Sequence, residues 1–258
     1  MIRAAVLAAG QCDAGFAEWF GVRHKCAVEI AGRPMLSWVL AALRDARSVG
    51  QFVVIGPPGP LRRSGAQDHE ILALDDCRFA DSVRAAVEAL RDEDRALILA
   101  ADMPLLTALA LDRYIESCLA LPADLCFPVI RFQDLNAHSP GVRKTWYTLR
   151  DGAFTKGNAI VVRPAFLKQR EARVQKLFEH RKHRRWTGLI GPAFAQRFAR
   201  RTLTLHDMQE GLSWYLRGRL RAVPADPEII IDVDEPEDVE YARRVLEERK
   251  VCEDRVLH

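Results

Sequence analysis

The sequence predicts an α/β fold in which helices cover both faces of a parallel β-sheet. Short apolar runs alternate with segments of helical periodicity, and strands separated by helices of this length are typical of βαβ units. The chain has 258 residues, of which 49% are hydrophobic and 28% charged. These are ordinary globular values, which exclude wholesale disorder and a collagen-like fibre. The length suits one large α/β domain or two small ones.

The first half of the chain carries the regular alternation. Its apolar runs predict strands at Ile2–Leu7, Phe52–Ile55, Glu70–Leu74, Ala96–Ala100 and Leu125–Ile130. Helical spacing predicts helices after Pro34, over Ser82–Leu90, and from Thr107, as a cap, through Leu121. Ligands of such sheets bind beyond the carboxyl ends of the strands. We therefore expect the ligand-binding residues in the loops that follow Leu7 and Ala100.

The second half is less regular. Residues 131–145 are expected to form a loop, and Trp146–Leu149, Asp151-Gly152 and Asn158–Val162 suggest a hairpin-like excursion. A basic helical section over 164–200 follows, and then come strands at Arg219–Val223 and Glu228–Val233 and a closing helix at Pro236–Glu248. Without a repeat or a Gly/Ser linker, we expect a single domain over 1–258 with a basic helical insert at about 164–216.

The cysteines indicate the compartment. The six are Cys12, Cys26, Cys77, Cys118, Cys126 and Cys252. No pair has C-x-x-C spacing, so a zinc knuckle or redox pair is not predicted, and reduced, mostly packed thiols are expected. No run approaches the roughly 18 apolar residues of a membrane-spanning helix. We expect a soluble, cytoplasmic protein, which could still touch a membrane surface.

Three segments carry candidate chemistry. The strand end Leu7–Gly10 can offer backbone N–H groups to a phosphate or base, and Lys25 is a point charge suited to a phosphate; a common turn and a solvated lysine are the alternatives. Asp102 follows a strand end and could hold a divalent cation or cap a helix. Asp232 and Asp234 would share one face of a strand, although Asp234 could instead cap the closing helix.

Taken together, these segments resemble a family. LAAG near the N-terminus, Lys25 before CAVEIAGRPMLSWVLAAL, then LILAADMPLL and DVDEPEDVEYARRVL are similar to the MobA-like nucleotidyltransferases. That group includes molybdenum-cofactor guanylyl- and cytidylyltransferases and sugar-phosphate nucleotidyltransferases. The resemblance covers about 1–130 and 219–246, and AFTKGNAIVVRP also fits it.

The resemblance implies a Rossmann-like, GT-A-type fold, with three αβα layers and a mixed, mostly parallel sheet. It also implies transfer of a nucleotidyl group from an NTP to an acceptor phosphate, with release of pyrophosphate and with Mg²⁺ as cofactor. Leu7, Ala8, Ala9, Gly10 and Ser82 would bind the nucleotide, Lys25 would neutralise phosphate charge, Asp102 and Asp234 would hold Mg²⁺, and Asn158 and Lys156 would face the acceptor. Ser82 and Arg78 would help to choose the base.

The loop after Gly10 departs from the family pattern. The family usually places an Arg four residues after this Gly, and here that place holds Ala14 within a longer loop, QCDAGFAEWFGVRHK. Its apolar Phe16, Trp19 and Phe20 predict a helical turn packed as a lid. Either NTP binding is rebuilt around Arg23 and Lys25, with Arg23 as a catalytic substitute, or it is weakened.

The charge of the chain is unevenly distributed. Residues 163–201 hold 12 Lys and Arg against two Glu, which gives this segment a net charge of +10. The whole chain carries +3, so the remaining residues sum to −7. Interleaved apolar residues predict an amphipathic helical pair broken near Gly188–Pro192. It could be a solvated cover, a surface that contacts anionic membrane, or, as the least favoured reading, a nucleic-acid site.

The expected function is therefore Mg²⁺-dependent nucleotidyl transfer to a phosphorylated small molecule, a sugar or polyol phosphate. Two alternatives remain open. One is a nucleotide-binding or interaction protein that kept the fold and lost turnover, and the other is a glycosyltransferase of the same architecture. The second lacks its usual Asp-x-Asp motif, because the matching strand end reads Ala100-Ala101-Asp102.

Overall fold

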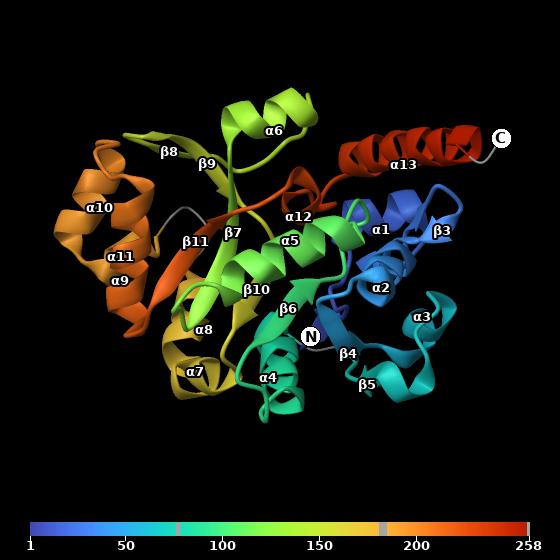
Figure 1. Cartoon of the computed structure of the whole chain (residues 1–258), viewed down its shortest axis with the longest axis horizontal. Coiled ribbons are helices and arrows are strands. Elements are labelled where there is room, and N and C mark those ends of the chain that lie inside the picture. The colour runs from blue at the N-terminus through green and yellow to red at the C-terminus, as the bar shows by residue number, and fades with distance from the viewer. Residues whose placement is uncertain (76–77, 181–184, 257–258) are drawn as a thin grey trace.

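The apolar runs form one mixed sheet in the computed structural model, which describes residues 1–75, 78–180 and 185–256 (Figure 1). Within these residues the sheet has nine strands in the order β5-β4-β1-β6-β10-β7-β9-β8, and β11 also pairs with β7. The strands are β1 Ile2–Leu7, β4 Val49–Gly56, β5 Ile71–Ala73, β6 Ala96–Ala100, β7 Leu125–Arg131, β8 Tyr147–Leu149, β9 Gly152–Lys156, β10 Ala159–Val162 and β11 Leu220–Pro224. A separate pair, β2 Glu29–Ile30 and β3 Arg33–Pro34, is antiparallel.

The parallel part of the sheet matches the prediction. Strand β1 lies between β4 and β6, and both pairings are parallel. The carboxyl ends of β1 and β6 therefore meet at one edge of the sheet, with Leu7 opposite Ala100. This edge is where the sequence places its candidate residues.

Helices cover both faces, as expected. They are α1 Ala14–Phe20, α2 Met35–Asp45, α3 Pro58–Arg63, α4 Phe79–Ala89, α5 Ala108–Leu119, α6 Phe132–His138, α7 Pro164–Gln169, α8 Glu171–Glu179, α9 Thr187–Ile190, α10 Pro192–Ala199, α11 Leu205–Leu216, α12 Pro227–Ile230 and α13 Pro236–Val256. Helices α2 and α5 pack in one core cluster, and α4, α7 and α11 pack in another. Figure 1 shows α5 crossing in front of the sheet.

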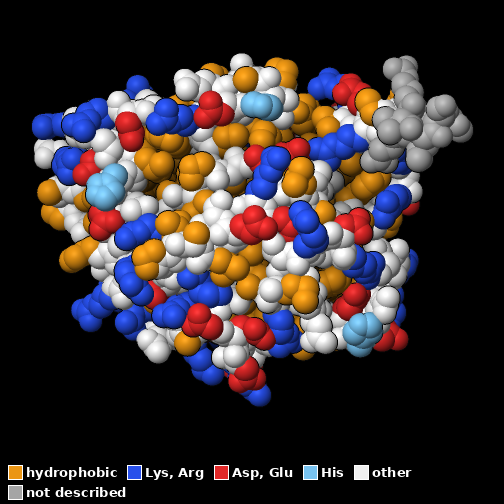
Figure 2. All heavy atoms as spheres, in the orientation of Figure 1, with side chains coloured by type: hydrophobic (Ala, Val, Ile, Leu, Met, Phe, Trp, Pro, Cys, Tyr) orange, Lys and Arg blue, Asp and Glu red, His pale blue; other side chains and the backbone are white. Residues whose placement is uncertain are grey.

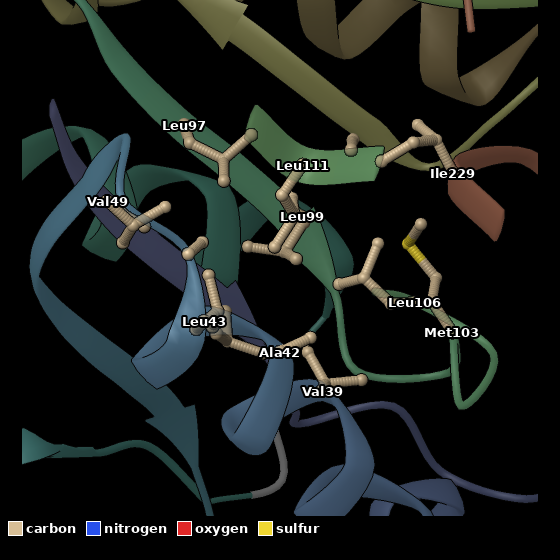
Figure 3. Packing of buried hydrophobic residues seen from close by; sticks show 14 of the residues in the cluster. Val39, Ala42, Leu43, Val49, Leu97, Leu99, Met103, Leu106, Leu111 and Ile229 are labelled. Carbon is tan, nitrogen blue, oxygen red and sulfur yellow. The ribbon is translucent and has the colours of Figure 1, made fainter. Parts of the chain in front are cut away.

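Alternation along the central strands creates these two cores. Ala4 and Val6 of β1 face the α2–α5 side, while Ala5 faces the α4 side, because successive strand residues point to opposite faces. The loop after Asp102 is anchored in the first core, where Met103 and Leu106 lie near Ile229 of α12 (Figure 3). Burial of these apolar side chains holds the strand ends that carry the candidate site.

Two predictions for the second half are wrong. Residues 131–145 contain helix α6, which the polar sequence concealed because only Leu135 of this helix is buried. The apolar run Glu228–Val233 is not a strand: Pro227 opens the short helix α12, and an extended segment follows it. Pro at the first position favours a helical turn, and Ile229 and Ile230 are buried within that turn.

The hairpin-like excursion is confirmed in part. Strands β8 and β9 form an antiparallel hairpin. Strand β10 continues instead into the centre of the sheet, where it is antiparallel to both β6 and β7. Gly157 permits this path, because a Cβ atom there would lie 2.3 Å from the carbonyl oxygen of Ile229.

The described part of the basic section forms four short helices, α7 to α10, where we predicted a helical pair. Apolar side chains of α9 and α10 cluster with Leu149 and Phe154 of the β8–β9 hairpin, whereas Phe166 and Leu167 of α7 pack with α4 in the second core. Of the predicted basic residues, Arg181, Lys182 and Arg184 lie outside the described part of the chain, as does Cys77. The other five cysteines are free thiols, and Cys26, Cys118 and Cys126 are buried.

Within the described residues, no helix is long and apolar enough to cross a bilayer.

Candidate active site

The candidate residues meet where three strands end. The N–H of Ala101 donates to the carbonyl of Leu7 (3.1 Å), and the N–H of Ala100 donates to that of Asn158 (3.0 Å). Ala8 is tied in turn to Ile55 of β4 (2.8 Å). Leu7, Asp102 and Asn158, which are far apart in the sequence, therefore lie at one edge of the sheet.

The loop between Gly10 and Lys25 is closed by backbone bonds. The N–H of Lys25 donates to the carbonyl of Gly10 (3.1 Å), and that of Cys12 donates to the carbonyl of Arg23 (2.9 Å). These bonds place exposed Arg23 at the base of the loop, two residues before Lys25.

The predicted helical turn is present as α1. Asp13 caps it by accepting from the N–H of Phe16 (2.9 Å), and Gly21 ends it at φ +64°. Phe16 is buried, whereas Trp19 is 75% exposed. Ala14, at the place of the family's Arg, is the first helical residue. The role of this turn as a lid stays a prediction.

Lys25 pairs with one of the predicted metal ligands. Its ammonium lies 2.6 Å from Oδ1 of Asp234 and 3.3 Å from the carbonyl of Val233. Burial disfavours its charge, but the hydrogen bond to Asp234 and the charges of Asp234, Asp102 and Asp232 outweigh it and raise the pKa of Lys25. Lys25 is therefore protonated at neutral pH.

Asp102 lies beside this pair and has no cation of its own among the described residues. Its Oδ1 is buried and, within the same residues, has no hydrogen-bond partner. Burial and the charge of Asp232 raise the pKa of Asp102 to about 7, although Lys25 opposes the shift. Such an orphaned carboxylate oxygen is a place where a cation or a substrate donor would be stabilised.

A buried pair that the sequence did not predict completes the site. Asp232 accepts one hydrogen bond from Lys144 and another, on its other oxygen, from Asn158. The side chains of Lys144 and Asp232 are only 8% and 11% exposed. Because a buried charge needs a partner, the two side chains stabilise each other in this position.

Packing explains how Lys144 reaches the site. Val142 and Trp146, on either side of it, join the same apolar cluster as Ile231 and Val233. The ring of Trp146 also meets Phe132 of α6 edge-on, with centroids 5.0 Å apart. No spacing in the sequence links a loop lysine to an aspartate 88 residues later, so this contact had no sequence signal.

The remaining predicted residues lie around this centre. Ser82 is buried in the first turns of α4, which packs on β1 and β4, and Arg78 precedes that helix and pairs with Asp81 (3.5 Å). Lys156 ends β9 opposite Val129, two residues before Asn158. The roles of Ser82, Arg78 and Lys156 stay predictions.

Asp234 does not cap the closing helix α13, which was the alternative to its role as a metal ligand. The backbone N–H groups of Asp234 and Glu235 both donate to Oδ2 of Asp238 (2.9 Å each). Asp238 is therefore the capping carboxylate at this helix start, and the carboxylate of Asp234 turns to Lys25.

Asp102 and Asp234 keep oxygens that could coordinate a cation. In the described part of the chain, no group of three or more His, Cys, Asp or Glu side chains is arranged to hold a metal ion. Mg²⁺, however, is usually held by one or two carboxylates together with substrate phosphates. Asp102 and Asp234 match that donor set, whereas both oxygens of Asp232 already accept hydrogen bonds.

A large cavity lies elsewhere. A hollow of about 590 Å³ opens at the ends of β7 and β11, beside α5, α6 and α12. Its lining includes Arg113, Arg131 and Asp134 and none of the carboxylates described above. We place the chemistry at the carboxyl ends of β1 and β6 because Lys25, Asp102 and Asp234 converge there.

Solved structures share this fold. A hypothetical transferase from Thermus thermophilus has a TM-score of 0.78 and 28% identity, over 93% of this chain and all of its own. A 2-C-methyl-D-erythritol 4-phosphate cytidylyltransferase, also from Thermus thermophilus, has a TM-score of 0.54 and 17% identity, over 95% and 98% of the two chains. A CMP:2-keto-3-deoxy-manno-octonic acid synthetase solved with CTP has a TM-score of 0.59 and 13% identity, over 96% and 100%.

The latter two likenesses show the fold alone. Among curated protein sequences, none matches this chain. The MobA-like NTP transferase domain, in contrast, matches residues 4–189, which include most of β1 and also Lys25, Asp102 and Asn158. The chain therefore belongs to the MobA-like NTP transferase family.

Proposed function

We propose that this protein transfers a nucleotidyl group from an NTP to a phosphorylated small molecule, a sugar or polyol phosphate, and releases pyrophosphate. An oxygen of the acceptor phosphate forms the new bond to the α-phosphorus. The bond from that phosphorus to the β-phosphate bridging oxygen breaks, and pyrophosphate carries away the electron pair. The supporting observation is the convergence of Lys25, Asp102 and Asp234 at one edge of the sheet.

The side chains suit this reaction because phosphoryl-type transfer depends mainly on positioning and charge neutralisation. The backbone of Leu7 to Gly10 would face the nucleotide, and Lys25 would neutralise charge on its phosphates. Asn158, which Asp232 orients, would face the acceptor. Arg23, at the base of the α1 loop, would take over the place of the family's loop Arg.

Asp102 and Asp234 would hold Mg²⁺, which when bound supplies charge neutralisation on the phosphate oxygens. The buried Oδ1 of Asp102, unpartnered within the described residues, supports this assignment. So does the raised pKa of Asp102, since a nearby cation would favour its ionised form.

A panel assay tests the proposal. Pyrophosphate release is measured for four NTPs, each with Mg²⁺ and a set of sugar and polyol phosphates, with CTP first because two structures of this fold are a cytidylyltransferase and a synthetase solved with CTP. We expect release that requires both an NTP and an acceptor phosphate and that Asp102→Asn abolishes. Full activity in Asp102→Asn would overturn the metal assignment.

The altered loop favours one alternative, a nucleotide-binding protein without turnover, because Ala14 supplies no charge where the family has Arg. NTP with Mg²⁺ would then raise the melting temperature, since a ligand that binds the native state stabilises it, but no pyrophosphate would appear. A glycosyltransferase would instead be stabilised by a nucleotide sugar and would release a free nucleotide.

We also propose that residues 163–201 contact an anionic membrane. The cytoplasmic location and the description of 164–216 as a helical insert are proposals too. Three cations of 163–201 pair with acids outside that segment: Arg163 with Asp94 (2.9 Å), Lys168 with Glu88 (3.1 Å) and Arg197 with Asp207 (3.1 Å). Figure 2 shows acidic side chains among the basic ones on the face drawn. Co-sedimentation with anionic liposomes at low salt tests the contact. If the protein does not pellet with the lipid, the contact is excluded.

A further inference from the structure

The ion pair of Lys25 places a protein cation on a proposed metal ligand. Its ammonium donates to Asp234 Oδ1 at 2.6 Å and also reaches the carbonyl of Val233. The Lys25 side chain is 21% exposed and that of Asp234 is 65% exposed. Asp234 is thus open to solvent on one side and covered by an ammonium on the other.

The second lysine of the site is already committed. Lys144 and Asn158 hold the two oxygens of Asp232 in a nearly buried arrangement. Lys25 therefore serves both remaining carboxylates: it pairs with Asp234, and its charge also acts on Asp102. The Lys25 ammonium also lies 5.8 Å from the ring centroid of Phe16, which connects it to helix α1.

We propose that Lys25 and a divalent cation compete for Asp234 in the nucleotide-free protein, so that the metal binds well only together with the nucleotide. This inference rests on the proposed function, because it concerns the same site. Two cations that approach one carboxylate repel each other, and because Lys25 occupies Oδ1 of Asp234, the metal can reach only the other oxygen until Lys25 leaves. The triphosphate resolves the conflict by offering its own oxygens to both cations.

The competition predicts coupling between the two ligands. A nucleotide that draws Lys25 onto its phosphates frees Asp234, and therefore raises the affinity of the protein for the metal. By linkage, the metal raises the affinity for the nucleotide by the same factor. The flexible four-carbon stem of a lysine suits a residue that changes partners in this way.

Mn²⁺ binding, followed by the loss of the electron paramagnetic resonance signal of the free ion, tests the inference without turnover. In Lys25→Met the ammonium is gone, and we expect nucleotide-free Mn²⁺ affinity to rise by about three- to fivefold, the upper range for a partly exposed ion pair. Lys25→Arg keeps the charge and should bind Mn²⁺ as weakly as the wild type. Asp234→Asn in the Lys25→Met background should remove the gain.

Arg143 provides a matched control for the simple loss of one positive charge. It pairs with Glu235 (3.6 Å) and Glu237 (4.0 Å) on the same segment as Asp234, and its side chain is 69% exposed. Arg143→Met should change Mn²⁺ affinity by less than about twofold, because exposed pairs contribute little. Circular dichroism and melting curves verify that each variant is folded.

The outcomes separate this inference from the proposed function. Unchanged Mn²⁺ affinity in folded Lys25→Met, or an equal gain in Arg143→Met, would overturn the competition whether or not the protein turns over an NTP. A gain confined to Lys25→Met supports the competition even if the pyrophosphate assay finds no acceptor.

Discussion

Asp102 should make the native protein less stable as pH rises, and Asp102→Asn should reverse this effect. Its Oδ1 is buried and lacks a hydrogen-bond partner within the described residues, and Asp232 lies close enough to repel its charge. A carboxyl group in this position is stable when neutral and unfavourable when ionised. Such a residue is expected at a functional site rather than at a structural one.

The size of the effect follows from the pKa. Burial raises the pKa of Asp102 from 3.8 to about 7. The native state therefore binds more protons than the unfolded state between these values, and stability falls as pH rises through that window. A shift of about three pH units corresponds to at most about 4 kcal/mol, and relaxation around the carboxyl lowers this to about 1–3 kcal/mol.

Urea denaturation without metal or nucleotide measures this difference. We expect Asp102→Asn to be more stable than the wild type by about 1–3 kcal/mol at pH 8, and by clearly less at about pH 4.5, where the carboxyl is mostly protonated in the native state and partly in the unfolded one. The two curves should converge below the unfolded-state pKa.

Asp112 is the matched control. Its side chain is 7% exposed, but it accepts from the N–H groups of Ser48 (2.7 Å) and Arg47 (3.2 Å). Burial opposes its ionisation, yet these hydrogen bonds outweigh burial and lower the pKa of Asp112. Its contribution to stability is present above the unfolded pKa and lost in acid, so Asp112→Asn should destabilise at pH 8. An Asp102→Asn protein that is less stable than the wild type at pH 8 would refute the reasoning.

Two further predictions concern the segments that hold the site. Lys144→Met leaves the nearly buried Asp232 without its cation and should lower the free energy of unfolding in urea by about 3 kcal/mol. Adding Asp232→Asn should restore part of this loss, and equal losses in the single and double variants would contradict the pairing. Gly157→Ala places a Cβ atom 2.3 Å from the carbonyl oxygen of Ile229 and should lower the melting temperature and weaken NTP binding. Gly188→Ala, which has open space around it, should do neither. An unchanged Gly157→Ala protein would show that α12 moves freely.

The sheet was predictable where strands are continuous apolar runs. Strands β1 and β6 were predicted with the bounds that the structure shows, because both are buried on two faces and are followed by small residues. The insertion of β10 between β6 and β7 was not predictable, since pairing between distant strands leaves no local pattern. Helix α12 was mistaken for a strand because a buried turn of isoleucines and a buried strand look alike in sequence.

The site was predictable to the same extent. Lys25, Asp102 and Asp234 follow from strand-end logic and the family resemblance, and the structure brings the three together. Lys144 escaped prediction because a buried ion pair depends on tertiary packing, here of Val142 and Trp146. The arrangement that Lys25 adopts was also hidden, because its pairing with Asp234 depends on the closure of the Gly10–Lys25 loop.

Transfer of label tests the central claim most directly. Protein is mixed in excess with α-³²P-labelled CTP, Mg²⁺ and each acceptor phosphate, and a single turnover is followed by chromatography. We predict that the label leaves CTP and joins an acceptor, with pyrophosphate released in equal amount, and that Asp102→Asn and Lys25→Met slow this step strongly. Label that stays in CTP, with the other three labelled NTPs equally inert across the same acceptors, would contradict the account.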